Sequence, residues 1–178
     1  MTAVKHLTTT ELEAGLDEIR QSPKDDGVLR LIVRRPQTDQ REVLQEGSLS
    51  LEEGLAGDKW KTHGNRPDLQ VTIMNARAIA LVAQDSARWS LAGDQLFIDL
   101  DLGADNLPPG TRLEIGSAVL EVSARPHNGC KKFMARFGND ALEFVNSPVG
   151  KHLHLRGVNA RVLRSGVIRV GDVVKKRV

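Results

Sequence analysis

The stretch Thr111-Arg112-Leu113-Glu114-Ile115-Gly116-Ser117-Ala118-Val119-Leu120-Glu121-Val122 is the part of the sequence that best indicates the fold. Apolar and polar residues alternate with a period of two over residues 111–115, which is typical of a strand with one buried face. Gly116 and Ser117 suit a tight turn, and residues 119–122 suit the returning strand. We therefore predict a β-hairpin, whose second strand leads directly into the segment that contains the only cysteine.

The same reasoning predicts further strands and a few helices along the chain. Apolar or β-branched runs predict strands at 28–33, 42–49, 69–73, 93–100, 157–163 and 170–175, of which the first two form a hairpin. Helices are predicted at 10–21, with a capping box at Thr8/Glu11 or Thr10/Glu13, and at 75–84, capped by Asn75. Two shorter helical turns are expected at 132–136 and 140–146. This pattern predicts a mainly β (α+β) fold, a barrel with short peripheral helices.

Length and composition exclude several classes of protein. The 178 residues suit a single domain, 1–178, in which residues 1–27 form an N-terminal helical extension. The net charge is +2 and aromatic residues make up 3%, with no tyrosine, which argues against a nucleic-acid partner. We see neither a signal segment nor a long apolar run, so we expect no membrane partner and a cytoplasmic location. A single cysteine suits a reducing compartment.

The segment Arg125-Pro126-His127-Asn128-Gly129-Cys130-Lys131-Lys132-Phe133 is the leading candidate for a functional site. Cationic side chains surround the sulfur, and a helix is predicted to begin next to it. Both features favour the thiolate, which is a nucleophile and a soft metal ligand. The residues alone equally allow a buried cysteine that acts as a small apolar side chain.

Histidines offer two weaker alternatives. Cys130 and His127 could form a nucleophile–base pair, although their spacing says nothing about geometry. His152 and His154 alternate, so in an extended segment they could ligate a metal together with His127 or Cys130. A solvated basic face is the more common origin of such a pair.

Three acids, Asp58, Asp94 and Asp172, each follow a glycine. For Asp94 and Asp172 we favour a turn residue whose carboxylate accepts backbone hydrogen bonds. Asp58 stays open, because Lys59, Trp60 and His63 crowd the same short loop.

Taken in order, several stretches resemble the MOSC family, the domain at the C-terminus of molybdenum-cofactor sulfurases that also occurs as stand-alone bacterial proteins. The resemblance covers about residues 28–174. It rests on Gly54–Asp58, Val71–Ala76, Gly93–Leu96, Leu107–Gly116, the Cys130 segment, and Arg156-Gly157 through Gly171-Asp172.

The resemblance implies a β-barrel and a cysteine, here Cys130, that carries sulfur or ligates molybdenum. It implies a small-molecule cofactor, the molybdenum cofactor (molybdopterin), and a redox or sulfur-donor partner protein. Cofactor-binding candidates are Arg125, His127, Asn128, Lys131, Lys132, Arg136, Asp58 and Arg156.

Two alternative functions stay open beside this one. Some family members reduce N-hydroxylated compounds with electrons from partner proteins, and a binding module with a buried Cys130 would be non-catalytic. The family's association with pyridoxal phosphate belongs to a separate sulfurase domain that this sequence lacks. Whether the protein is an enzyme is left open.

Two departures from the family pattern affect the candidate site. Many members have a proline directly before the cysteine, where this chain has Gly129. Many follow the early Gly-Asp with Arg-His, where this chain has Lys59-Trp60. The first difference could change the shape of the loop, and the second puts an anion-binding role for the Asp58 loop in doubt.

Overall fold

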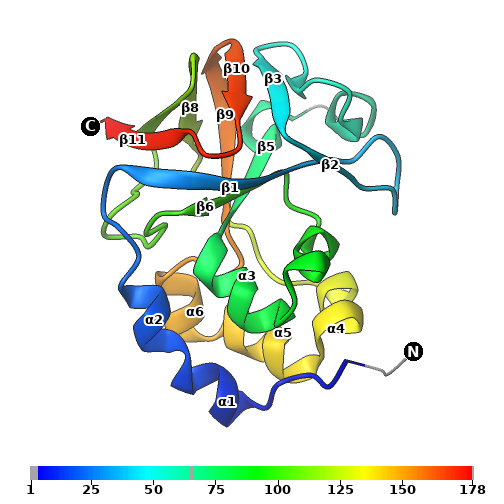
Figure 1. Ribbon diagram of the computed structural model, residues 1–178, viewed down its shortest axis with the longest axis vertical. Coiled ribbons are helices and arrows are strands. Elements are labelled where there is room, and N and C mark those ends of the chain that lie inside the picture. Colours follow the sequence, from blue (N-terminus) through cyan, green and yellow to red (C-terminus); the bar gives the residue numbers. More distant parts are fainter. Residues whose placement is uncertain (1–3, 65, 178) are drawn as a thin grey trace.

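A closed β-barrel forms one half of the computed structural model, which describes residues 4–64 and 66–177 (Figure 1). The barrel strands are β1 (Gly27–Arg34), β5 (Val71–Asn75), β6 (Leu96–Asp99), β7 (Arg112–Ile115), β8 (Ala118–Val122), β9 (Val158–Arg164) and β11 (Val173–Arg177). They pair in the order β11-β7-β8-β9-β5-β6-β1, and β11 also pairs with β1, which closes the barrel. The predicted mainly β (α+β) fold is confirmed, as is the hairpin β7–β8.

One parallel pair in the barrel requires a crossover, and this crossover begins the helical layer. β5 and β6 are parallel, so the chain must return along α3 (Ala76–Ala83) and the 3-10 helix η3 (Ser86–Ala92). Asn75 ends β5 and caps α3, as predicted, because its Oδ1 accepts a hydrogen bond of 2.9 Å from the Ala78 N–H.

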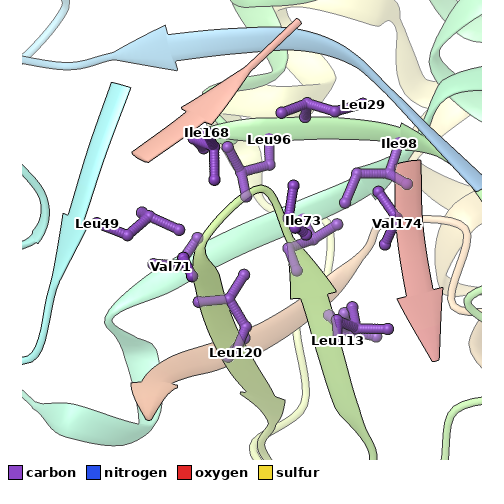
Figure 2. Packing of buried hydrophobic residues seen from close by; sticks show 14 of the residues in the cluster. Leu29, Leu49, Val71, Ile73, Leu96, Ile98, Leu113, Leu120, Ile168 and Val174 are labelled. Atoms are coloured by element: carbon purple, nitrogen blue, oxygen red, sulfur yellow. The ribbon is translucent and has the colours of Figure 1, made fainter. Parts of the chain in front are cut away.

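The barrel interior is apolar. Figure 2 shows side chains from opposite walls meeting there, among them Ile73, Leu96, Leu113, Leu120 and Val174, all fully buried. Burial of this kind is the main favourable term in folding, so the alternation seen in the sequence positions the strands.

A layer of short helices covers one end of the barrel (Figure 1). Its members are α1 (Thr9–Ala14), α2 (Leu16–Arg20), α3, α4 (Lys131–Phe137), α5 (Asn139–Asn146) and α6 (Pro148–His152). The predicted helix 10–21 is broken in two at Gly15, where a Cβ atom would lie 2.6 Å from the Leu81 side chain. The capping box is Thr8 with Glu11. A second hydrophobic core lies among these helices and includes Ile79, Phe133 and Phe144. Leu12 is fully buried in this second core, so the N-terminal extension contributes to it.

The predicted partner strand 42–49 is wrong in its second half. β2 (Glu42–Leu44) pairs with β1, but β3 (Glu46–Ser50) turns away into a second sheet with β4 (Gly54–Leu55) and β10 (Gly166–Arg169). Leu49 and Ile168 from this sheet are buried in the barrel core, which explains the change of partner. Among the described residues, no helix has the length and apolar character needed to cross a membrane.

Candidate functional site

Cys130 lies at the start of α4, directly after the loop that leaves β8. It is the N-cap residue of this helix, with extended backbone angles, and it is exposed to solvent. Cys130 is therefore not buried, as the alternative of a non-catalytic binding module with a buried Cys130 would require. Phe133 and Phe137 from the same helix are buried in the second core and fix the helix that presents the thiol.

The surroundings of Cys130 favour its thiolate. Partial burial acts to raise the pKa of the thiol, but the backbone amides of Phe133 and Lys132 and the charges of Arg156 and Arg136 outweigh it, so the pKa is lowered. The sulfur makes no cap hydrogen bond of ordinary geometry. The thiolate is thus stabilised by nearby positive groups and remains free to react or to bind a metal.

Gly129, found where the family often has proline, fits its surroundings closely. Its N–H donates a 2.9 Å hydrogen bond to Asn146 Oδ1, and Asn146 Nδ2 donates to its carbonyl at 3.2 Å. A Cβ atom at this position would lie 2.8 Å from Leu142 Cδ1 and 2.9 Å from Val145 Cγ2. The departure from the family pattern therefore belongs to a loop that is fastened to α5 through the glycine backbone.

We expect Gly129→Pro to destabilise the protein by at least about 2 kcal/mol, because it removes a donor, leaves Asn146 Oδ1 without its partner and adds atoms to a filled space. Urea unfolding would measure the change. Gly129→Ala is the matched control: it keeps the N–H and crowds only the ends of three side chains, those of Leu142, Val145 and Asn146, so it should cost less. Equal unfolding midpoints for Gly129→Pro and the wild type would contradict this reading of the loop.

A buried ion pair lies next to the Cys130 loop. Arg156 Nη1 donates to Asp94 Oδ2 at 2.5 Å and Arg156 Nη2 donates to the Ala92 carbonyl at 2.9 Å. The Asp94 side chain is fully buried, and the guanidinium of Arg156 also lies over the Phe133 ring at 5.1 Å. The prediction of a turn role for Asp94 is therefore wrong, whereas Asp172 does accept a turn hydrogen bond, from the Arg169 N–H at 2.7 Å.

His127 faces this ion pair. Its Nδ1 lies 3.5 Å from Asp94 Oδ1, and neither of these two buried atoms has a hydrogen-bond partner among the described residues. Burial and the charge of Arg156 lower the pKa of His127 to about 4, although Asp94 acts in the opposite direction. His127 is therefore neutral at physiological pH, and it holds no charge with which to bind an anion.

Five cations lie near one another, two of them on α4, and we call them the cationic cluster: Arg35, Arg41, Lys59, Lys132 and Arg136. Burial lowers the pKa of Arg41, and the charges of Arg136 and Arg35 lower it further. Burial likewise lowers the pKa of Lys59, with added effects from Arg35, Lys132 and Arg41. The charge effects that add to burial indicate that these positive groups lie close together.

The region around Gly93 shows the same crowding at the atomic level. A Cβ atom there would lie 3.6 Å from Arg41 Nη2 and 3.8 Å from Arg136 Nη1. The Arg41 Nε is buried without a hydrogen-bond partner among the described residues. Asp39 is an acidic neighbour of the cluster at the protein surface. Its side chain is 70% exposed, and its Oδ1 lies 3.4 Å from Arg136 Nη2.

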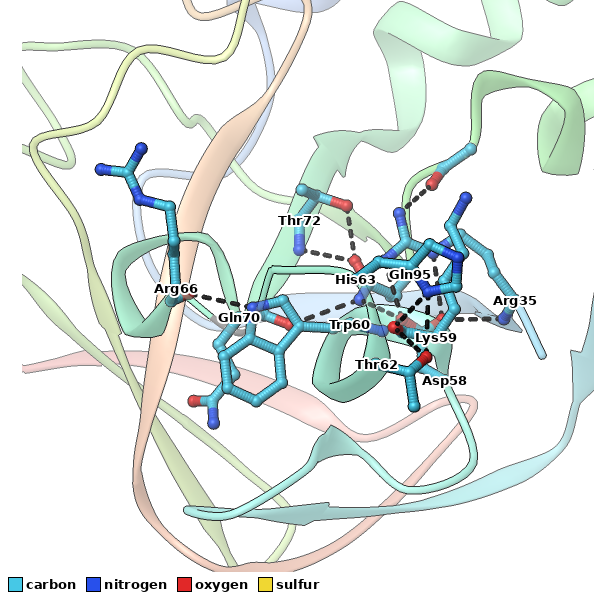
Figure 3. A network of polar contacts seen from close by, with 11 residues as sticks. Arg35, Asp58, Lys59, Trp60, Thr62, His63, Arg66, Gln70, Thr72 and Gln95 are labelled. Atoms are coloured by element: carbon cyan, nitrogen blue, oxygen red, sulfur yellow. Dashed lines mark hydrogen bonds and ion pairs between the residues drawn. The ribbon is translucent and has the colours of Figure 1, made fainter. Parts of the chain in front are cut away.

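Asp58 fixes one side of the cationic cluster. It accepts from Arg35 Nε at 3.0 Å and Nη2 at 2.8 Å, and from the Trp60 N–H at 3.1 Å (Figure 3). Gln95 Nε2 donates to the same carboxylate at 3.2 Å. All of its acceptor capacity is thus used inside the protein, so Asp58 positions Arg35 and the 3-10 helix η1 (Lys59–Thr62).

The remaining candidates separate into two groups. Lys132, Arg136 and Arg156 lie near Cys130 or near one another, as the sequence suggested. Arg125 and Asn128 instead line a neighbouring cavity together with His127, and Lys131 is exposed at the first turn of α4.

The proposed histidine pair is not formed. His152 ends α6 and contacts Asp105 at 2.9 Å, whereas Nδ1 of His154 lies 2.6 Å from the Leu102 carbonyl. The segment is helical and not extended, so alternation does not apply to it. No group of three or more His, Cys, Asp or Glu side chains suited to a metal occurs in 4–64 and 66–177.

Sequence reasoning missed Arg35, Arg41 and the pairing of Asp94 with Arg156. Arg35 and Arg41 flank a polar turn and look like ordinary surface charge, and 62 positions separate Asp94 from Arg156. Lys59 could have indicated the cationic cluster from the sequence. It directly follows Gly57-Asp58, where many family members have Arg-His, so this position carries a cation in both cases.

Comparisons with known proteins agree with this architecture. A family model described as the MOSC domain matches residues 61–175. A solved structure of a hypothetical protein aligns with a TM-score of 0.58 at 21% identity, covering 89% of this chain and 70% of the other. YiiM from Escherichia coli aligns with a TM-score of 0.56 at 21% identity, covering 85% and 70%. YUAD from Bacillus subtilis aligns at 0.56 and 14% identity, covering 84% and 95%. No curated protein sequence matches the chain.

Proposed function

Because this chain belongs to the MOSC domain family, we propose that it binds a molybdenum cofactor, with the Cys130 thiolate as a ligand of the metal. The observation that carries the proposal is the cationic cluster beside an exposed cysteine whose pKa is lowered. A soft thiolate suits molybdenum, and the cations suit the phosphate of molybdopterin.

The residues present fit such a cofactor. Burial is the main cause that lowers the pKa of Arg41 and Lys59, and an anion placed near them would offset both this burial and the added repulsion from neighbouring cations. It would also offer an acceptor to the buried Arg41 Nε, which lacks a partner among the described residues. When bound, the cofactor would supply a redox-active metal next to Cys130.

The cationic cluster favours cofactor binding over a role as a bare sulfur carrier. A sulfur carrier needs only one nucleophilic thiol on which a persulfide forms. It does not require the five cations of the cationic cluster, whereas an anionic cofactor does. Reduction of N-hydroxylated compounds is the further activity that the family suggests. It needs an external electron donor, so a redox partner protein belongs to that hypothesis.

The test is to purify the protein from cells that make the cofactor and to measure molybdenum and pterin per chain. We expect the wild type to contain both, Cys130→Ala to lose the metal, and Arg41→Met to lose pterin while the thiol stays reactive. Arg20→Met, a surface arginine that is 48% exposed, is the matched control and should change neither.

Two results would count against the proposal. Wild-type protein that contains neither metal nor pterin would overturn it. A stable persulfide on Cys130 in protein free of metal and pterin would replace it with the sulfur-carrier function.

A further inference from the structure

A cavity of about 380 Å³ lies next to the Cys130 loop but is not lined by Cys130. It shares residues 123–128 with that loop and is completed by β9 and the segment after α6. His127 and Arg156 belong to its wall, so the buried ion pair with Asp94 borders it. Four cofactor-binding candidates from the sequence line it (Arg125, His127, Asn128 and Arg156), but the cationic cluster and Cys130 do not.

Its walls are apolar and its charges all have one sign. Leu107, Val122 and Val158 form a buried apolar surface, and Arg125 and Lys151 are exposed members of the lining. No acidic residue lines the cavity, and neither cation forms an ion pair within residues 4–64 and 66–177. An apolar body with one negative charge is the kind of ligand that this arrangement complements.

Two histidines add acceptors to the same cavity. His154 Nδ1 must carry a hydrogen, because its partner at 2.6 Å is the Leu102 carbonyl, and this leaves Nε2 as the other ring nitrogen. His127 is neutral, and we assign its hydrogen to Nδ1, which faces the Asp94 carboxylate. Neither Nε2 forms a hydrogen bond with the described part of the chain, and both histidines line the cavity.

His154 lies at a turn in the backbone that follows α6. Its φ of 50° lies in the left-handed region, where a residue with a Cβ atom is uncommon. Asparagine or glycine would adopt this conformation more easily.

We propose that this cavity binds a small organic carboxylate that has an apolar body and a hydroxyl group. The carboxylate pairs with Arg125 and Lys151, the body packs on Leu107, Val122 and Val158, and the hydroxyl donates to a histidine Nε2. The proposal does not depend on the cofactor, because it uses no atom of Cys130.

Titration calorimetry of the full chain with 4-hydroxyphenylacetate tests the proposal. We expect saturable binding that weakens by about tenfold for phenylacetate, which lacks the hydroxyl, and for 4-hydroxyphenylacetamide, which lacks the charge. Arg125→Gln should weaken the preference for the acid over the amide, and Arg125→Gln combined with Lys151→Gln should remove it. His154→Asn should weaken the preference for the hydroxyl, because it removes one of the two histidine acceptors, while asparagine can keep the hydrogen bond to Leu102 and tolerates the positive φ.

Ala104→Phe, which places a large side chain on the cavity wall, should abolish binding. Circular dichroism and the melting temperature show that each variant is folded, and Cys130→Ala should bind like the wild type. Absence of binding by wild-type protein at millimolar ligand would overturn the proposal. So would equal affinities for the acid and the amide, or binding that Ala104→Phe leaves unchanged in folded protein.

Discussion

Replacing Asp94 by alanine is expected to destabilise the protein by about 3–5 kcal/mol, the usual cost of leaving one partner of a buried ion pair alone. Arg156 is 8% exposed in its side chain, so water cannot replace the lost carboxylate. The remaining hydrogen bond from Arg156 Nη2 to the Ala92 carbonyl does not neutralise the charge. Urea unfolding followed by circular dichroism measures the loss.

The double variant Asp94→Ala with Arg156→Met separates the charge effect from a general loss of packing. Methionine keeps an apolar stem near the Phe133 ring and removes the uncompensated charge, so the double variant should be more stable than Asp94→Ala alone. A double variant that is less stable than the single one would show that the ion pair is not the source of the effect.

Stability is also expected to fall by up to about 3 kcal/mol as the pH drops from 6.5 towards 4, because of His127 alone. Burial, together with the charges of Arg156 and Arg35, lowers the pKa of His127 in the native protein to about 4, although the charge of Asp94 acts to raise it. Between these pH values His127 binds a proton in the unfolded chain but not in the native protein. Proton binding therefore stabilises the unfolded state and lowers the free energy of unfolding. Above pH 6.5 both states are neutral and the contribution is fully present.

The measurement is urea unfolding of the wild type and of His127→Gln at several pH values between 7 and 4. Carboxylates with a lowered pKa, such as Glu114, affect both proteins equally and cancel in the comparison. The wild type should lose more stability than the variant over this range. Parallel pH profiles would mean that His127 is not buried in its neutral form.

Local sequence signals predicted much of the fold. The hairpin β7–β8, the Asn75 cap of α3 and the Thr8–Glu11 capping box each depend on residues within a few positions of one another. Such signals act before distant parts of the chain meet, so they can be read from sequence. The second sheet could not, because its strands β3 and β10 lie more than a hundred residues apart and are recruited by the barrel core.

The site divides in the same way. Cys130 and its neighbours Lys132 and Arg136 were found because they are consecutive or one helical turn apart. Arg35 and Arg41 were missed because their surroundings depend on a turn that brings them to Gly93 and α4. The role of Asp94 was mistaken because a glycine before an acid also suits a turn, and only the distant Arg156 decides between the two.

Cys130 is an exposed thiol whose pKa is lowered by the backbone amides at the start of α4 and by nearby arginines. The pH dependence of its alkylation by iodoacetamide in native protein tests this most directly, since only the thiolate reacts. The claim predicts fast labelling with an apparent pKa below that of an ordinary cysteine, moved upward in Arg136→Gln. Labelling that requires unfolding, or that titrates at or above the ordinary thiol pKa and ignores Arg136→Gln, would contradict it.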